Sequence, residues 1–169
     1  MPAQFGAKLR SLRRQYNMTQ ADLARYLTPT TPAQLSKIEA GRRVPSIDVV
    51  FRIATLFGET IEYLLRDNLA VGMTTTRAST NASRPQDRSM SADEAVRQLA
   101  VFRTKLQSLR RKQGLTQSGL AYHVGVRTLE HISQLETGRT LPSVDLVLRL
   151  ADLFGVTPDY LLRDTNEWC

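Results

Sequence analysis

Side chains that could carry catalysis or bind a metal ion are few in this sequence and poorly spaced for either role. His123 and His131 lie eight residues apart (131 − 123), with no cysteine or carboxylate beside them at metal-ligand spacing. Cys169 follows Trp168 and has no neighbouring histidine or aspartate to activate its thiol. A glycine-rich phosphate loop and a paired-carboxylate motif are both missing from the sequence. We therefore expect no catalytic residue, no metal site and no cofactor.

The composition favours ionic interactions with a binding partner. The 169 residues carry 23 Lys and Arg against 16 Asp and Glu, a net charge of +7. Residues 1–70 hold 10 basic and 6 acidic side chains, residues 71–98 hold 4 and 3, and residues 99–169 hold 9 and 7, so the segments contribute +4, +1 and +2. A mild, distributed excess is typical of compact domains with a basic face, and it indicates a polyanionic partner.

The sequence argues against a membrane protein and against a secreted one. No apolar stretch approaches the roughly 20 residues that a transmembrane helix needs. The segment from Met1 to Phe5 lacks the basic start and apolar core of a secretory signal. The single cysteine excludes a disulfide framework. We expect a soluble, cytoplasmic protein with no membrane partner.

The chain contains one pattern twice. Residues 5–67 align without a gap onto residues 102–164, at an offset of 97 (102 − 5). The segment YLLRD at residues 63–67, for example, returns at residues 160–164. Because unlike sequence separates the copies, they indicate a duplicated domain rather than a solenoid.

The sequence between the copies predicts a flexible linker. Residues 69–90 are rich in Thr, Ser, Ala, Asn and Arg and have almost no large apolar side chain, so they cannot bury a core. Ser91 and Glu94 then form a capping-box signature that starts a helix near Ala92. We expect a first domain at residues 1–68, the linker at 69–90 and a second domain at 91–169.

Each copy predicts five helices and no strand. Apolar residues at helical spacing mark a first helix that ends near Asn17 or Gly114 and is longer in the second copy. Gly41 and Gly138 suit the left-handed position that ends the third helix. Residues with N-cap side chains begin the later helices: Thr19 and Thr116 the second, Thr31 and Thr128 the third, Ser46 and Ser143 the fourth, and Thr60 and Thr157 the fifth.

Short motifs at these positions resemble the helix-turn-helix domains of the phage repressor, Cro and XRE family. In the first copy they are Thr19-Gln20, Leu23-Ala24, Ser36, Glu39 with Gly41-Arg42, and Pro45-Ser46, and residues 116–143 carry the same set. The resemblance covers both copies nearly end to end and leaves out the linker and the termini. It implies an all-α fold of two tandem five-helix, lambda-repressor-like helix-turn-helix domains joined by the flexible linker.

The resemblance also implies which residues face DNA, since the third helix of this family enters the major groove while the second crosses the backbone. In the second copy, Leu129 and Glu130 stand where many relatives have polar base-reading side chains, and a carboxylate is repelled by phosphates. The implied DNA-binding residues are Gln20, Thr31, Pro32, Ala33, Gln34, Lys37, Arg42 and Arg43 in the first copy, and Gln117, Thr128, Leu129, Glu130, His131, Gln134 and Arg139 in the second.

Other charged residues have structural interpretations. Arg13 with Glu39, and Arg110 with Glu136, resemble the family's internal ion pair between the first and third helices, so we do not count them as DNA contacts. Arg14 in the first copy, and Arg111 and Lys112 in the second, either contact DNA or form a solvated helix face. The sequence leaves both interpretations open. A solvated side chain is likewise the alternative for Gln20 and Gln117.

Together these inferences predict a sequence-specific, DNA-binding transcriptional regulator with no enzymatic activity, and a repressor rather than an activator. The linker's root-mean-square reach, on the order of 25 Å, is compatible with half-sites roughly 34 Å apart. One chain could thus occupy a bipartite site on double-stranded DNA, and a homodimer is equally open. In the alternative function one domain binds DNA and the second binds a protein, such as an antirepressor or a toxin; Leu129 and Glu130 motivate it.

Overall fold

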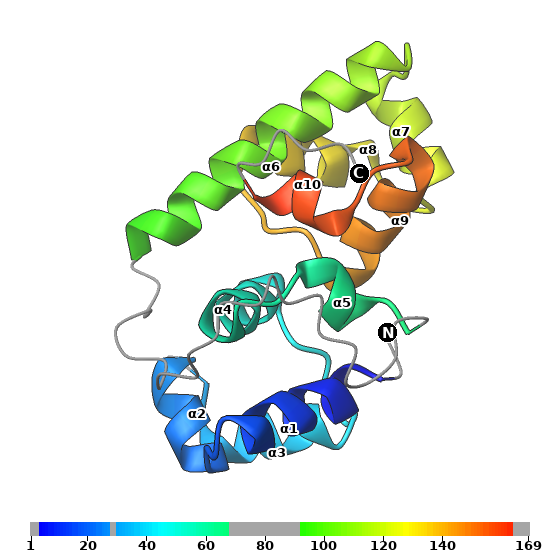
Figure 1. Ribbon diagram of the computed structural model, residues 1–169. Coiled ribbons are helices and arrows are strands. Elements are labelled where there is room, and N and C mark those ends of the chain that lie inside the picture. Colours follow the sequence, from blue (N-terminus) through cyan, green and yellow to red (C-terminus); the bar gives the residue numbers. More distant parts are fainter. Residues whose placement is uncertain (1–3, 28–29, 68–91, 164–169) are drawn as a thin grey trace. The chain divides into compact units, whose positions relative to one another are not determined.

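The structure, a computed structural model, describes residues 4–27, 30–67 and 92–163. The chain divides into two compact units, unit 1 at residues 1–90 and unit 2 at residues 91–169. All regular structure in the described residues is helical, with no strand (Figure 1). The predicted all-α class is therefore confirmed. The predicted linker at residues 69–90, and the Ser91 cap that follows it, lie outside the described residues.

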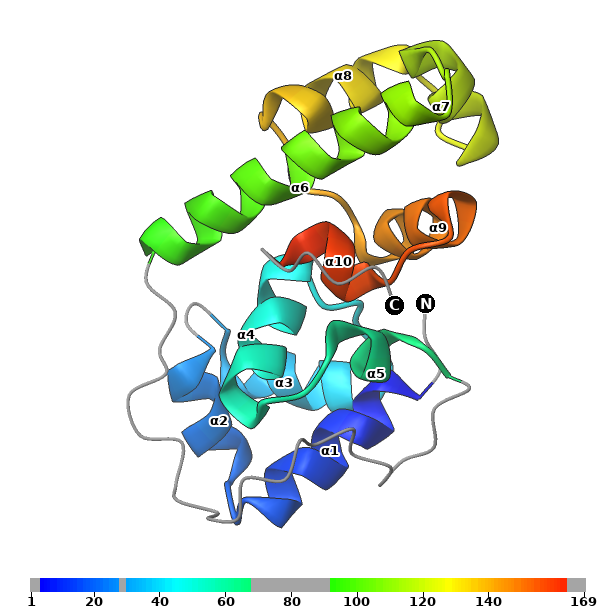
Figure 2. The same cartoon turned by 45° about the horizontal axis from the view of Figure 1, so that its top comes forward.

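Unit 1 is a bundle of five short helices around one core. The first helix packs on the third and the fifth, the second packs on the third, and the fourth packs on the fifth (Figures 1 and 2). Leu9, Leu23, Leu35, Ile53 and Leu64 come from the five helices in turn and are all fully buried. The helices are α1 (Phe5–Gln15), α2 (Gln20–Tyr26), α3 (Pro32–Glu39), α4 (Ile47–Phe57) and α5 (Ile61–Leu65).

Unit 2 repeats this arrangement. Its first helix spans 21 residues against 11 in α1, as the sequence predicts, and packs on the third and fifth helices of its own unit. None of the described helices in either unit is both long enough and apolar enough to cross a membrane. The helices are α6 (Ala92–Lys112), α7 (Gln117–His123), α8 (Leu129–Thr137), α9 (Val144–Phe154) and α10 (Pro158–Leu162).

The predicted N-cap residues fix most of the helix starts. Seven of them accept a hydrogen bond from the backbone N–H three residues further on, each worth about 1 kcal/mol to its helix. These are Thr19, Thr31, Ser46 and Thr60 in unit 1, and Thr116, Ser143 and Thr157 in unit 2.

Thr128 is the exception. It precedes α8, but its side chain makes no capping hydrogen bond. The N–H of His131 donates to the backbone carbonyl of Thr128 at 3.3 Å, so the Thr128 hydroxyl does not receive it. The prediction that the Thr128 side chain caps the third helix is therefore wrong.

The predicted glycine stops lie where the third helices end. Gly41 follows the last turn of α3 with φ +69°, and Gly138 directly caps α8 with φ +74°. This left-handed conformation turns the chain out of the helix and is adopted readily by glycine. Local sequence thus bounds α3 at both ends, and it bounds α8 at its C-terminal end.

Gly6 lets α1 approach the end of α3 closely, and replacing it with alanine should destabilise unit 1. A Cβ atom there would clash with the backbone carbonyl oxygen of Glu39 and would lie 2.8 Å from that of Ile38. Backbone atoms cannot rotate away, so we expect an overpacking cost of about 1–3 kcal/mol that exceeds alanine's helix propensity gain of about 1 kcal/mol. Urea unfolding measures it, with exposed Ala7→Ser as the control. A Gly6→Ala variant more stable than the parent chain would contradict the close approach.

Candidate nucleic-acid interface

The third helix of unit 1, α3, has one buried face and one exposed face. Leu35 and Ile38 are buried in the core, at 0% and 2% exposure. Residues three and four apart share a helix face, so the positions between them face outward. Those outward positions hold Thr31, Pro32, Ala33, Ser36 and Lys37, which are exposed, and Gln34, which is partly exposed.

The third helix of unit 2, α8, is arranged in the same way. Ile132 and Leu135 are fully buried and hold the helix to its own core. The residues predicted to face DNA are again on the outer side: Thr128, Leu129 and Glu130 are exposed, and His131 and Gln134 are partly exposed. Both units thus present the side chains that the sequence singled out.

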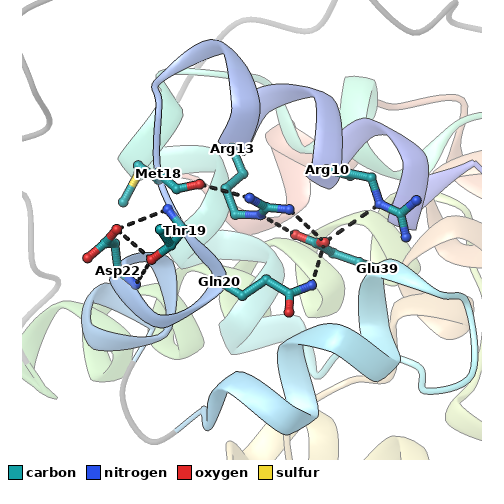
Figure 3. A network of polar contacts seen from close by, with 7 residues as sticks. All are labelled: Arg10, Arg13, Met18, Thr19, Gln20, Asp22 and Glu39. Atoms are coloured by element: carbon teal, nitrogen blue, oxygen red, sulfur yellow. Dashed lines mark hydrogen bonds and ion pairs between the residues drawn. The ribbon is translucent and has the colours of Figure 1, made fainter.

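The inner side of α3 is tied to α1 and α2 by one buried carboxylate, that of Glu39 (Figure 3). Arg13 donates to both of its oxygens, from Nε to Oε1 at 2.7 Å and from Nη2 to Oε2 at 3.1 Å. Arg13 Nη1 also donates to the carbonyl of Met18, between α1 and α2, at 2.8 Å. The Nε atom of Arg10 lies 3.7 Å from Oε2. A charged pair with this many hydrogen bonds fixes the orientation of α3.

Unit 2 contains the same arrangement around Glu136. Arg110 donates to both carboxylate oxygens, with Nη2 to Oε2 at 3.1 Å, and Nη1 donates to the carbonyl of Leu115 at 2.8 Å. The predicted ion pairs between the first and third helices are therefore confirmed in both units.

Gln20 and Gln117 turn their side-chain amides inward, to these carboxylates. Gln20 Nε2 donates to Glu39 at 2.9 Å, and Gln117 Nε2 donates to Glu136 at 2.8 Å. These two side chains brace the third helix rather than extend into solvent. A phosphate contact by either residue stays a prediction.

Burial of Glu39 and Glu136 would by itself raise the pKa of each carboxyl. The hydrogen bonds from Arg13 and Gln20, and from Arg110 and Gln117, outweigh that penalty together with the nearby positive charges, so each pKa lies below its ordinary value of 4.5. Both groups are therefore carboxylates at neutral pH, as the hydrogen-bonded networks require.

Acid should consequently destabilise both units. A carboxyl whose pKa is depressed by folding contributes stability that is complete above its unfolded pKa, near 4.5, and is lost as the pH falls through the lower folded pKa. Urea midpoints measured from pH 7 to pH 3 should fall more steeply below about pH 4.5 for the parent chain than for a Glu39→Gln, Glu136→Gln variant. If the urea midpoints of the two proteins fell equally with pH, Glu39 and Glu136 would not be the source of the acid sensitivity.

Comparison with known proteins agrees with this geometry. Residues 9–64 match a family model described as "Helix-turn-helix", and residues 101–163 match one described as "Helix-turn-helix domain". A relative from Archaeoglobus fulgidus, described as an uncharacterized HTH-type transcriptional regulator, is 37% identical over 69 residues, which are 40% of this chain and 97% of the relative. The chain belongs to the helix-turn-helix family. No solved structure gives a significant match.

Family membership confirms the resemblance seen in the sequence, and with it the class of function, that of a DNA-binding transcriptional regulator. In this helix-turn-helix protein, α2 with α3 and α7 with α8 are the two helix-turn-helix pairs. Arg42 and Arg43 follow α3 and Arg139 follows α8, and all three are exposed. Their predicted position beside the DNA backbone is sterically open.

A lysine contact that the sequence did not lead us to expect ties the first helix of each unit to the last. Lys8 is fully buried, and its Nζ donates to the carbonyls of Tyr63 and Arg66, both at 2.6 Å. Burial lowers the pKa of Lys8, against the opposing charge of Asp67. Lys105 makes the same pair of bonds, at 2.7 and 2.8 Å, in unit 2. The available signal was a lysine on the apolar face of a predicted helix at the same position in both copies.

Four large apolar side chains of the described residues are exposed, and only Leu129 among them was expected at the interface. Val44 and Leu141 occupy equivalent positions in the loop after each third helix and are 55% and 53% exposed. Tyr122 of α7 is 84% exposed, where the first copy has Arg25. Leu129, which the resemblance had placed in the interface, is 48% exposed. Among the residues that the structure describes, unit 2 therefore exposes more large apolar side chains than unit 1.

Proposed function

We propose that this helix-turn-helix protein is a sequence-specific repressor that binds operator DNA through α3 of unit 1 and α8 of unit 2. The observation that supports this most is the division of each third helix into an anchored face and an open one. Glu39 and Glu136 hold the inner faces, while the residues predicted to meet base edges are on the outer faces. A rigidly held helix with a free outer face is what entry into a major groove requires.

Charge supports a larger electrostatic role for unit 1. Around α3, Lys37, Arg42 and Arg43 are exposed, and the acidic Glu39 is buried and paired. Phosphate neutralisation supplies most of the sequence-independent affinity for DNA. We therefore assign the main backbone contacts to unit 1, within a non-catalytic protein of the cytoplasm.

Binding of the full chain to randomised duplexes at several salt concentrations tests the proposal. We expect a log-log slope of about −0.9 for each phosphate contacted, together with enrichment of a defined site. Failure to retain any duplex at low ionic strength would overturn the proposal. Sedimentation of the bound complex then decides between one chain and a homodimer on the site.

A protein partner for unit 2 is the second candidate function. Tyr122 of α7 and Leu129 of α8 are exposed, and aromatic side chains such as Tyr122 are enriched in protein interfaces, whereas the acidic Glu130 after Leu129 is repelled by phosphates. Footprinting with the full chain separates the two functions. Protection of a single half-site, unchanged by replacement of Arg139, would favour a protein partner for unit 2.

A further inference from the structure

The outer face of α3 presents hydrogen-bond donors. The Oε1 atom of Gln34 accepts from the backbone N–H of Thr31 at 3.2 Å, within the capping box that starts the helix. This bond occupies the acceptor end of the amide and leaves its NH₂ group as the part available to a ligand. Lys37, three residues further along the same face, is exposed and carries three N–H donors and no acceptor.

The outer face of α8 presents acceptors. Gln134 aligns with Lys37 (134 − 97 = 37), and its Nε2 donates to Oε1 of Glu130 at 3.3 Å. A carboxylate has no hydrogen to give, so the glutamine must turn its NH₂ group toward it. The groups left for a ligand are the Gln134 carbonyl with its second amide N–H, and the carboxylate oxygens of Glu130, an acidic acceptor that α3 lacks because Ala33 stands at the equivalent position (130 − 97 = 33). The two third helices therefore differ in hydrogen-bonding polarity at equivalent positions.

Base edges in the major groove distinguish these polarities. Guanine offers two acceptors, O6 and N7, which suit Lys37 and Gln34. Cytosine offers only the N4 donor, which suits Glu130. Leu129, exposed at the first turn of α8, adds an apolar surface for a thymine methyl group. Guanine and cytosine stand together in every G·C pair, so the two helices differ in which base of the pair, and at which position of the helix, they contact.

The charges around α8 remain compatible with DNA. Arg127 and Arg139 are exposed before and after the helix, so with Glu130 the exposed charge of residues 127–140 is +1, because Glu136 is buried and paired. Across residues 30–43 the corresponding value is +3, from Lys37, Arg42 and Arg43. The flanking arginines offset the repulsion that an acidic side chain meets near phosphates, and this favours DNA over a protein as the ligand of α8.

We propose that the two units read unlike half-sites, with Lys37 of α3 contacting a guanine and Glu130 of α8 contacting a cytosine at a position where α3 has Ala33, so that one chain recognises an operator without two-fold symmetry. This rests on the proposed function, that both units bind DNA. It goes beyond that function in naming the polarity of each half-site and the residues that set it.

Selection of preferred duplexes from a random pool by the full chain tests the proposal. The parent chain should enrich two different half-sites in one fixed order. Glu130→Gln should weaken the preference for cytosine at one position by about tenfold and shift it toward adenine, because an amide both donates and accepts. Lys37→Ala should relax a guanine position in the other half-site only. Asp152→Asn, which removes an exposed negative charge on α9, is the matched control and should leave both half-sites unchanged.

Each other result has a definite meaning. Enrichment of two identical half-sites, or a Glu130→Gln profile equal to that of Asp152→Asn, would overturn the proposal while leaving DNA binding intact. Enrichment of one half-site that only Lys37→Ala alters would also overturn it, and would assign unit 2 to a protein partner. Absence of any enriched duplex would remove the proposed function itself.

Discussion

Glu39→Ala should reduce the stability of unit 1 by about 3–5 kcal/mol, the usual cost of removing one partner from a buried ion pair. The guanidinium of Arg13, whose side chain is 13% exposed, and the amide of Gln20 would lose their common acceptor. Hydrogen exchange on the full chain measures the effect, because amide protection reports unit 1 separately from unit 2. Protection should fall across α1 to α5.

Two comparisons separate this effect from a general loss of charge. Glu62→Ala removes a partly exposed carboxylate whose pairing with Arg66 along α5 is worth less than about 1 kcal/mol. Combining Glu39→Leu with Arg13→Met should recover part of the loss, since a buried pair is often replaceable by apolar residues. If Glu39→Ala costs no more than Glu62→Ala, the network does not hold α3 in place.

The second large effect concerns binding. Arg42→Gln with Arg43→Gln should make the salt slope shallower by roughly 1.8, or two phosphates at about 0.9 each, and should weaken binding to all duplexes alike. Adding Lys37→Ala should cost about 1–3 kcal/mol more on the preferred site than on a scrambled one. Electrophoretic mobility shifts over a salt series give both quantities.

The matched control removes the same charge elsewhere. Arg97 on α6 and Arg149 on α9 are exposed and lie outside both third helices. Changing both to glutamine should leave the slope nearly unchanged if Arg42 and Arg43 are the phosphate ligands. If both double variants changed the salt slope equally, the affinity would depend on net charge alone and not on Arg42 and Arg43 in particular.

Local chemistry explains why so much of the fold could be predicted from the sequence. Thr19, Thr31 and Ser46 cap helices through bonds that reach only three residues along the chain, and Gly138 ends α8 through its own φ. The duplication helped as well, because the cap residues and the helix-ending glycine of the first copy recur at equivalent positions in the second. Where capping failed, at Thr128, a backbone hydrogen bond satisfied the same N–H group, and such competition is not visible in residue types.

The candidate site was predictable only in part. The identity of the third helices as the ones that face DNA followed from the family resemblance, and so did the pairing of Arg13 with Glu39. The direction of a side chain did not, because Gln20 and Lys8 are polar residues that bond to partners 19 and 55 positions away along the chain. Only the folded arrangement of α1, α2, α3 and α5 brings those partners together.

Glu39 and Glu136 are anchored by residues that take no part in the outer faces of their helices, and this separation has an evolutionary consequence. Selection can exchange the outward side chains of either copy while the scaffold beneath keeps its stability. After the gene segment was duplicated, the two copies were therefore free to diverge in what they recognise without a matching divergence in architecture. The chain thus uses one scaffold twice, with different outward side chains on the third helix of each copy.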